Sequence, residues 1–312
     1  MKNSQTISEN MKQDTAHESK CRLCPRECGA DRASGQRGYC GMDGRIKIAR
    51  AALHYWEEPP ISGTHGSGTV FFSGCNLKCV YCQNKDVSHH RLGTVISENE
   101  LEDTMLRLQA EGAENINLVT PTHYSDTLAK LLYKIKGKLN IPVVWNSSGY
   151  EKPETLEILD GLIDIYLPDF KYADTELAGL YSDAPDYPEV ALKAIHKMYS
   201  QVGKSVFGDD GLLKRGMIIR HLVLPGCRKN SFAVLDAIAS SIPVSDVKIS
   251  LMSQYTPDFA IGCGFKNLER RITTFEYDSV LRYAEKLGFD GYFQERTSAD
   301  KCYTPEFYGD KE

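Results

Sequence analysis

Three closely spaced cysteines are the residues of this sequence best suited to metal chemistry. Cys75, Cys79 and Cys82 follow the spacing C-x3-C-x2-C. Three thiolates on one short loop can bind three irons of a [4Fe–4S] cluster, whose full protein complement is four. The remaining iron is then open to a substrate or cofactor. The spacing alone also fits a zinc knuckle that borrows a fourth ligand from His89 or His90.

A second group of cysteines precedes the first. Cys21, Cys24, Cys28 and Cys40 supply four soft ligands, enough for tetrahedral zinc or for a fully ligated iron–sulfur cluster. The surrounding segment, 21–45, is short and glycine-rich, so a bound metal is the expected substitute for a hydrophobic core. We favour zinc, because four closed positions leave no site for catalysis. An auxiliary cluster that relays electrons is the alternative.

The other cysteines are scattered along the chain. Cys227 follows an expected strand and is a candidate hydrogen-atom donor, whereas Cys263 and Cys302 lie in a loop and near the tail. A plain free thiol is the simpler interpretation of all three. The polar start, Met1–Lys20, lacks the apolar core of a signal peptide, which favours a reducing, cytoplasmic location. Clustered cysteines then indicate metal or redox chemistry rather than disulfides.

Short apolar strands alternate with amphipathic helices from about residue 69 onward. The expected strands are Thr69–Gly74, Ile116–Thr120, Ile141–Asn146, Ile163–Pro168, Met217–Leu224, Val247–Met252 and Gly291–Phe293. The expected helices are Glu98–Ala110, Asp126–Lys138, Pro153–Asp160, Glu189–Gln201, Ser231–Ser240 and Phe275–Leu287. Ser97 with Glu100, and Thr273 with Glu276, form capping boxes that predict where two of these helices begin.

This alternation predicts an α/β fold with parallel strands. The strands are apolar along their length, as when both faces are covered. No G-x-G-x-x-G follows the first strand, so a partial (β/α) TIM-type barrel fits better than an open nucleotide-binding sheet. Such barrels place their chemistry at the carboxyl ends of the strands. Polar residues follow five of the expected strands, at Thr120–His123, Asn146–Ser148, Asp169–Lys171, Arg220–His221 and Ser253–Tyr255.

The chain divides into four expected parts. They are a disordered lead-in over 1–20, the four-cysteine metal module over 21–45, a connecting segment over 46–68 and the barrel domain over 69–312. At 41% hydrophobic and 25% charged residues, the composition is that of a globular protein. The net charge of −5, without a long basic run, argues against a nucleic-acid partner. No apolar run is long enough for a membrane span.

The cysteine loop resembles the signature of the radical S-adenosylmethionine (SAM) superfamily. The aromatic Tyr81 stands before the third cysteine, and the wider string GCNLKCVYCQN is similar to pyruvate formate-lyase activating enzymes. The strings EEPPISG, GSGTVFFSGCN, WNSSGYE, DIYLPDFKY and RHLVLPG resemble uncharacterised homologues of those enzymes. The likeness extends from Cys21 to about Gly288. The loop motif is specific for the superfamily. The resemblance does not imply which substrate this protein would act on.

The resemblance implies a cofactor and a reaction. Cys75, Cys79 and Cys82 would hold a [4Fe–4S] cluster whose open iron binds SAM through the amino and carboxylate groups. An electron, delivered by a donor such as flavodoxin or ferredoxin, would release a 5′-deoxyadenosyl radical that abstracts hydrogen from a substrate. A glycyl residue of a partner enzyme is one target, and a small metabolite or a peptide is another. The non-enzymatic alternative is a metal-binding interaction protein.

The resemblance also marks residues that would contact SAM. These residues are Tyr81, Thr120, Thr122, Asn146, Ser147, Asp169, Lys171 and Arg220. Tyr81 matches the aromatic near the adenine, and Arg220 matches a basic residue that would pair with the SAM carboxylate. Asn146 replaces a carboxylate of the relatives, so a nearby cation would be held more weakly. Taken singly, each residue also has a structural interpretation, such as an ion pair between Asp169 and Lys171.

Overall fold

The computed structural model describes residues 20–293 and Phe307, so the expected lead-in before Lys20 and the thiol of Cys302 lie outside the described residues. Strands and helices alternate as predicted. The strands are β1 (Lys47–His54), β2 (Ser67–Phe72), β3 (Thr94–Val95), β4 (Ile116–Val119), β5 (Val143–Ser147), β6 (Ile165–Pro168), β7 (Val206–Phe207), β8 (Leu213–Leu222), β9 (Lys248–Met252) and β10 (Gly291–Phe293). The helices are α2 (Pro59–Ser62), α3 (Lys85–Ser88), α4 (Glu98–Ala110), α5 (Ser125–Ile135), α6 (Pro153–Glu157), α7 (Thr175–Ser182), α8 (Tyr187–Val202), α9 (Arg228–Ala239) and α10 (Thr274–Lys286).

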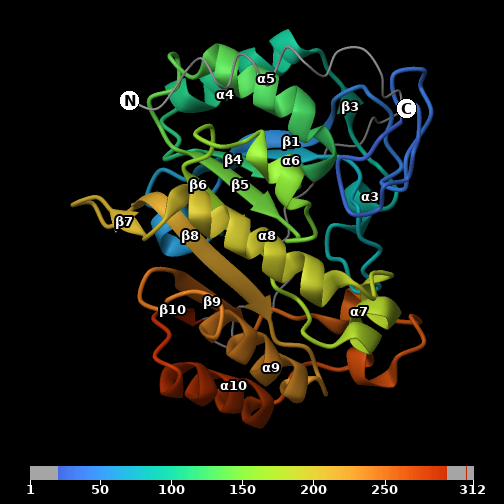
Figure 1. Ribbon diagram of the computed structural model, residues 1–312, viewed down its shortest axis with the longest axis vertical. Helices are drawn as coiled ribbons and strands as arrows, with labels where there is room; N and C mark the ends of the chain where they lie inside the picture. The colour runs from blue at the N-terminus through green and yellow to red at the C-terminus, as the bar shows by residue number, and fades with distance from the viewer. Residues whose placement is uncertain (1–19, 294–306, 308–312) are drawn as a thin grey trace.

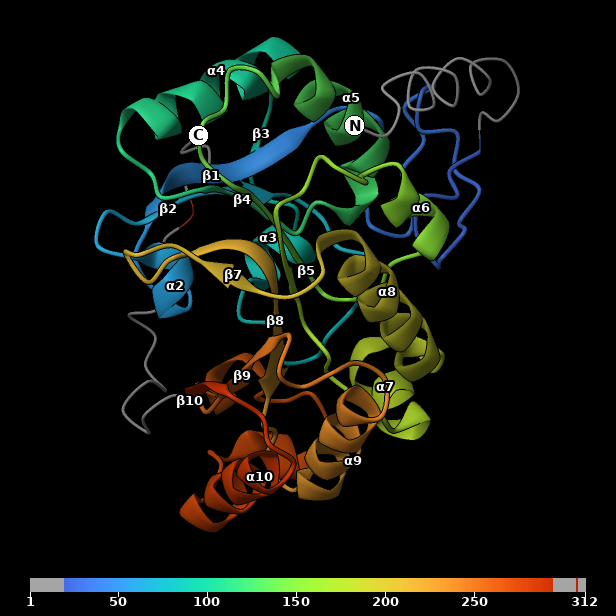
Figure 2. The same cartoon turned by 60° about the vertical axis from the view of Figure 1, so that its left-hand side comes forward.

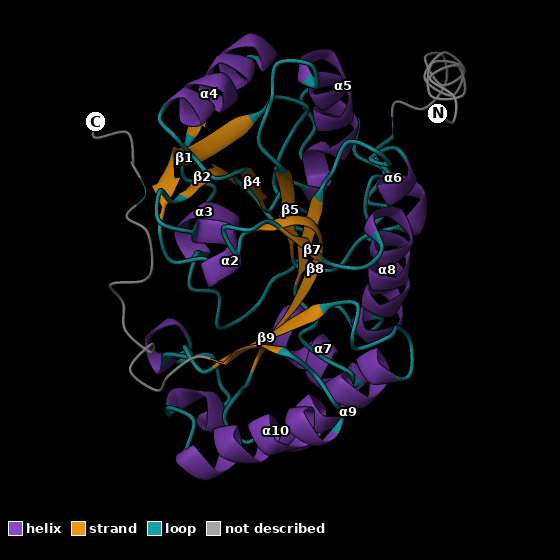
Figure 3. Ribbon diagram, turned by 90° about the vertical axis from the view of Figure 1, so that its left-hand side faces the viewer, coloured by secondary structure: helices purple, strands orange, loops and turns teal. Residues whose placement is uncertain are grey.

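The strands form one curved sheet that does not close. Its spatial order is β10-β9-β8-β6-β5-β4-β2-β1-β3, and β7 pairs with β8 off this path. All neighbours from β10 to β2 are parallel, whereas β1 is antiparallel to both β2 and β3. Figure 3 shows the strands as an arc with the long helices on its convex side and α2 and α3 on its concave side. The predicted α/β partial barrel is confirmed.

Strand β1 is one of the elements that the sequence analysis did not anticipate, together with α2, α3, β3, α7 and β7. It lies within the expected connecting segment, 46–68, and pairs with β2 from Ile48↔Phe72 to His54↔Ser67. Its sequence, KIARAALH, breaks the alternation of polar and apolar residues that marks a half-buried strand. By covering the edge of β2, it lets every residue of that strand be buried. The strand that leads into the cysteine loop is therefore held on both sides.

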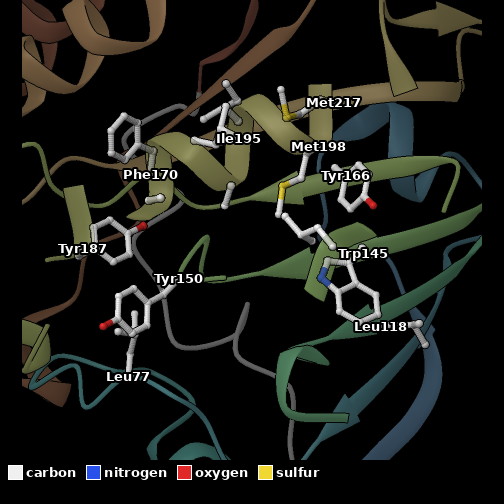
Figure 4. Packing of buried hydrophobic residues seen from close by; sticks show 14 of the residues in the cluster. Leu77, Leu118, Trp145, Tyr150, Tyr166, Phe170, Tyr187, Ile195, Met198 and Met217 are labelled. Carbon is white, nitrogen blue, oxygen red and sulfur yellow. The ribbon is translucent and has the colours of Figure 1, made fainter. Parts of the chain in front are cut away.

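Helices pack on the convex side of the sheet along its whole length. Figures 1 and 2 show α4 and α5 over the β1–β4 end, and α9 and α10 over the β9–β10 end. Figure 4 shows the middle of this layer, where Ile195 and Met198 of α8 face Trp145, Tyr166 and Met217 of the sheet. All five side chains are fully buried. Within the described residues, no helix has both the length and the apolarity that a membrane crossing requires.

Two helices begin where the capping boxes predict. Ser97 Oγ accepts a hydrogen bond from the backbone N–H of Glu100, whose carboxylate accepts one from the Ser97 N–H. Thr273 and Glu276 repeat this pair of bonds at the start of α10. Each box satisfies two backbone groups that a helix start leaves without partners. Local sequence therefore marks both helix starts, although the carboxylate of Glu276 also accepts from the N–H of Gly226.

Candidate active site

A cavity of about 660 Å³ opens on the concave side of the sheet. The strand ends and the cysteine loop that line it come from segments far apart in the sequence. Of the residues expected to bind the cluster or SAM, those that line it are Cys75, Cys79, Cys82, Tyr81, Thr120, Asn146, Ser147, Asp169, Lys171 and Arg220. Thr122 is buried outside the lining. The structure thus brings nearly all of the predicted residues to one place.

The cysteine loop begins directly after β2, and each of its thiols has a hydrogen-bond partner. The Leu77 N–H donates to Cys75 Sγ at 3.4 Å, and Ser182 Oγ donates to Cys79 Sγ at 3.0 Å. Cys82 Sγ lies 3.2 Å from Ser88 Oγ. Donors to sulfur stabilise thiolates, which are the form that binds iron. The partners therefore suit a site for thiolate ligands.

The acidity of these thiols fits a metal cluster. Burial and the neighbouring thiols of Cys79 and Cys82 raise the pKa of Cys75 to about 12. Burial also raises the pKa of Cys79, against the charge of Lys171. Buried thiols that resist ionisation alone lose their protons readily to a bound cation. This donor set fits a [4Fe–4S] cluster held through three thiolates.

A single metal ion fits the loop less well. Within the described part of the chain, no group of three or more His, Cys, Asp and Glu side chains has a geometry that could hold one metal ion. His90 Nδ1 instead lies 3.0 Å from the carboxylate of Asp86, and neither His89 nor His90 lines the cavity. Each thiolate of a cube binds a different iron, so the three sulfurs need not converge on one point. The geometry favours the cluster over the zinc knuckle.

Tyr81 is connected to the cysteine loop by a chain of hydroxyl groups. Its hydroxyl lies 2.6 Å from that of Tyr172, which lies 2.8 Å from Ser182 Oγ. Ser182 in turn donates to Cys79 Sγ. Burial raises the pKa of both tyrosines well above the ordinary value, so they stay neutral. The chain fixes the Tyr81 ring against a thiol that would bind the cluster.

A charged network occupies the strand ends beside the cysteine loop. Arg220 donates to Asp169 Oδ1 through Nε at 3.0 Å and to Asn146 Oδ1 through Nη2 at 2.6 Å. Lys171 Nζ lies 2.5 Å from Asp169 Oδ2. Burial alone would raise the pKa of Asp169, but the charges of Arg220 and Lys171 outweigh it and hold that pKa below its usual value. The structure therefore confirms the ion pair between Asp169 and Lys171.

Two glutamates of this cavity were missed by the sequence analysis. Glu57 Oε2 lies 3.4 Å from Arg220 Nη1, and its Oε1 accepts from Asn117 at 3.1 Å and from Asn146 at 3.3 Å. Glu58, the next residue, also lines the cavity. Glu57 thus brings a carboxylate next to Asn146. The paired acids of the string EEPPISG are the signal that would have marked them.

Thr122 contributes its hydroxyl to a buried carboxylate instead of the cavity. Glu151 Oε1 accepts from Thr122 Oγ1 at 2.7 Å and from Trp145 Nε1 at 2.9 Å. Ser147 Oγ donates to Glu151 Oε2 at 2.9 Å. Burial raises the pKa of Glu151 against these three donors. Glu151 was also missed by sequence reasoning, and it positions Ser147, which does line the cavity.

The four N-terminal cysteines lie near one another. A Cβ at Gly38 would stand 3.0 Å from Cys28 Sγ and 3.6 Å from Cys40 Sγ. Burial, together with the thiols of Cys40, Cys21 and Cys28, raises the pKa of Cys24 to about 12. The absence, within the described residues, of a group arranged to hold one metal ion includes these four cysteines, so their fit to a metal rests on the chemistry of the four soft donors alone. Which metal they bind stays a prediction.

The four-cysteine segment packs directly against the cysteine loop of the cavity. Arg26 Nε donates to the Asn76 carbonyl at 2.8 Å, and its guanidinium lies 4.0 Å from the centre of the Tyr39 ring. Gly74, just before the loop, has a φ of +86°, and a Cβ there would stand 2.4 Å from Met42 Cγ and 2.8 Å from the Cys40 carbonyl oxygen. Gly74 therefore allows the two segments to touch.

Gly74→Ala is expected to lower the free energy of unfolding by about 3 kcal/mol, because left-handed strain and a steric clash add. Gly112→Ala is the matched control, since Gly112 has a φ of +90° and no atom within 4 Å of its Cβ position. It should cost only the strain, about 1 kcal/mol. Denaturant unfolding of both variants measures the difference. Equal losses would contradict the contact between the two segments.

The candidate hydrogen-atom donor Cys227 lies outside the cavity lining. It is buried at the start of α9, where Asn267 Nδ2 approaches its sulfur to 3.9 Å. Cys263 is partly exposed and also lies outside the lining. A thiol that donates hydrogen must reach the substrate. The position of Cys227 favours the interpretation as a free thiol.

Comparison with known proteins places the chain in a family. The model of the radical SAM superfamily matches residues 69–209. The uncharacterized protein MJ0674 of Methanocaldococcus jannaschii is 30% identical over 286 residues, which cover 86% of this chain and 75% of that protein. MJ0808 of the same organism, also uncharacterized, is 23% identical over 45% of this chain and 46% of its own length.

A solved structure supports the fold. Streptococcus suis SuiB, in its crystal structure with the precursor peptide SuiA, matches 71% of this chain with a TM-score of 0.50 and 14% identity. The match covers 46% of the SuiB chain, so this protein spans about half of it. At that identity the likeness concerns the fold alone. From the matching family model, the relative MJ0674 and the cysteine loop at the cavity, we conclude that the chain belongs to the radical SAM superfamily.

Proposed function

We propose that this protein cleaves SAM reductively and uses the resulting 5′-deoxyadenosyl radical to abstract a hydrogen atom from a substrate. The observation that carries the proposal is a single cavity into which Cys75, Cys79 and Cys82 face, beside the charged strand ends. A [4Fe–4S] cluster bound there would supply the electron for cleavage and an open iron for SAM. One electron and SAM give methionine and the radical, and hydrogen abstraction gives 5′-deoxyadenosine.

The residues around the loop would bind and orient SAM. Arg220 and Lys171 are the permanent cations of the described lining, so they are the groups suited to the SAM carboxylate. Tyr81, held by its hydroxyl chain, would lie against the adenine. Thr120, Asn146 and Ser147 would offer polar contacts. Thr122 would act indirectly, by holding Glu151 and through it Ser147.

The test is product formation in purified protein. The full chain is reconstituted with iron and sulfide without oxygen, then given dithionite and SAM. We expect 5′-deoxyadenosine and methionine in equal amounts, detected by chromatography and mass spectrometry. A protein that binds a [4Fe–4S] cluster and SAM but forms no 5′-deoxyadenosine would contradict the proposed reaction.

For the target, we propose a glycyl residue of a partner enzyme, with flavodoxin or ferredoxin as electron donor. The open sheet leaves one side of the cavity without strands, as a protruding loop would require. Tyr55 and Trp56 also line the cavity and are 52% and 60% exposed, which suits contact with a macromolecule. The partner should be recovered by pull-down and should show a glycyl radical signal in electron paramagnetic resonance after activation. A metabolite or peptide substrate would leave that signal absent.

For the N-terminal cysteines, we propose a structural zinc ion. Cys24→Ala is then expected to lose about one zinc per chain while it retains the iron bound near Cys79. Cys263→Ala, which removes a partly exposed thiol elsewhere, should keep both metals. Elemental analysis of the three proteins measures this. Wild-type protein without zinc, together with a partial loss of iron in Cys24→Ala, would show that the segment binds an auxiliary cluster instead.

A further inference from the structure

The end of the cavity that faces α2 is acidic and has no role in the proposed chemistry so far. Glu57 and Glu58 enter it from the segment just before α2, which lies on the concave side of the sheet in Figure 3. Glu57 is fully engaged, since its two oxygens contact Asn117, Asn146 and Arg220. Among the described residues, Glu58 does not have hydrogen-bond or ion-pair partners at both of its carboxylate oxygens.

One carboxylate oxygen of Glu58 is buried without a partner. The residue is only 8% exposed, and its Oε2 forms no hydrogen bond within the described part of the chain. An isolated polar atom at such a depth costs free energy unless something satisfies it. Burial raises the pKa of Glu58, and the charge of Arg220 opposes that rise. The side chain is therefore short of a donor or a cation.

The charges that line the cavity leave one carboxylate uncompensated. Outside the cysteine loop, the described lining holds the carboxylates of Glu57, Glu58 and Asp169 but only two permanent cations, Lys171 and Arg220. Asp169 forms an ion pair with Lys171, and both Asp169 and Glu57 form ion pairs with Arg220. Glu58 also lies within the field of Arg220, so three carboxylates of the described lining share two permanent cations and none is left for Glu58 alone.

The one histidine of the described lining does not correct this imbalance. Burial and the charge of Arg50 lower the pKa of His54 to about 4, so its ring is neutral at physiological pH. Ser250, which also lines the cavity, brings a hydroxyl but no charge. A further positive charge that would hold Glu58 in its ionised form would then come from a bound molecule.

We propose that Glu58 binds a cationic nitrogen of the substrate, a protonated amine or a guanidinium. The inference rests on the proposed function, because the substrate must share the cavity with SAM for a radical to reach it. A cation at Glu58 would pair the orphan oxygen and balance the charge of the lining. It would also anchor the substrate at the end of the cavity beside α2. The same chemistry occurs in free amines and in lysine or arginine side chains of a polypeptide.

Equilibrium binding tests the inference without turnover. The reconstituted full chain is titrated by calorimetry with butylamine, a mimic of the lysine side chain, and with butanol and butyrate as neutral and anionic controls. Butylammonium should bind about tenfold or more tightly than either control. Glu58→Gln should weaken its binding by about tenfold, while Glu285→Gln, an exposed site on α10, should leave it unchanged. Equal binding of amine and butanol to the wild type would overturn the inference.

Two further measurements are needed. The first identifies the source of the cationic ligand, and the second tests whether Glu58 has only a structural role. A polypeptide source is indicated if a lysine tripeptide binds more tightly than butylamine and loses this affinity when its lysine is acetylated. A free amine is indicated if butylamine binds more tightly than the tripeptide. Glu58→Gln should keep or raise the unfolding temperature, because it removes an unpaired buried acid. A lower unfolding temperature with unchanged amine affinity would make Glu58 structural and overturn the inference. Wild-type protein that forms 5′-deoxyadenosine but shows no amine preference would leave the proposed function intact.

Discussion

Cys79→Ala is expected to abolish 5′-deoxyadenosine formation, by about a thousandfold or more, because ligands that act as a unit lose their function together. Cys79 is buried, and its sulfur accepts from Ser182 in the hydroxyl chain that also holds Tyr81. Alanine removes one of three ligands, and with two thiolates the cluster is not retained. The variant should therefore lose its iron and the visible absorption of the cluster along with its product.

Cys227→Ala provides the matched control for this variant. Cys227 is also buried, but it lies outside the cavity lining. It should keep iron, absorption and product formation at the wild-type level. Chromatography of the nucleoside and iron analysis of each protein measure both effects. Product at the wild-type rate in Cys79→Ala would refute the assignment of Cys75, Cys79 and Cys82 as the cluster ligands.

The parts of the fold that local sequence determines were predicted closely. Helix α4 has the predicted bounds, Glu98–Ala110, because the capping box at Ser97 marks its start and its apolar residues share one face. Strand ends followed by polar residues located most of the cavity, since parallel strands present their carboxyl ends at one edge. The cysteine loop was identified as a candidate cluster site from its spacing alone.

The parts that depend on long-range contacts were not predicted. Glu57 and Arg220 are 163 residues apart, and only the curvature of the sheet brings them together. Strand β1 lacks an alternating pattern in its sequence. Its place in the sheet is determined by its pairing with β2 and β3, which no local pattern indicates. Thr122 was expected to contact SAM, but the direction of its hydroxyl depends on Glu151, which no local pattern connects to it. The sequence identified which residue types could act at the site, but it did not predict which side chains would form hydrogen bonds or ion pairs with one another.

Arg220→Met is expected to lower the free energy of unfolding by about 3–5 kcal/mol near neutral pH, the usual cost of removing one partner from a buried ion pair. The side chains of Arg220 and Asp169 are each 15% exposed, and that of Glu57 is 10% exposed. Methionine fills a similar space without charge. It leaves Asp169 with Lys171 alone and leaves Glu57 with no cation.

The loss should grow as the pH rises. In the wild type, the pKa of Asp169 lies below its usual value, so its contribution is present above the pKa of the unfolded chain and is lost as the pH falls toward the folded pKa. Burial already raises the pKa of Glu57 in the presence of Arg220, and removal of that charge would raise it further. Both carboxyls can take up protons in the variant at low pH. The difference between the two proteins should therefore be smaller near pH 4 than near pH 7.

Arg215→Met is the control, because Arg215 lies on the same strand but is exposed. It should cost less than about 1 kcal/mol at either pH. Adding Asp169→Asn to Arg220→Met should recover part of the loss, since it neutralises a carboxylate that the arginine had balanced. Denaturant unfolding at the two pH values measures all four proteins. A loss in Arg220→Met that does not change with pH would mean that packing, rather than buried charge, holds these strand ends in place.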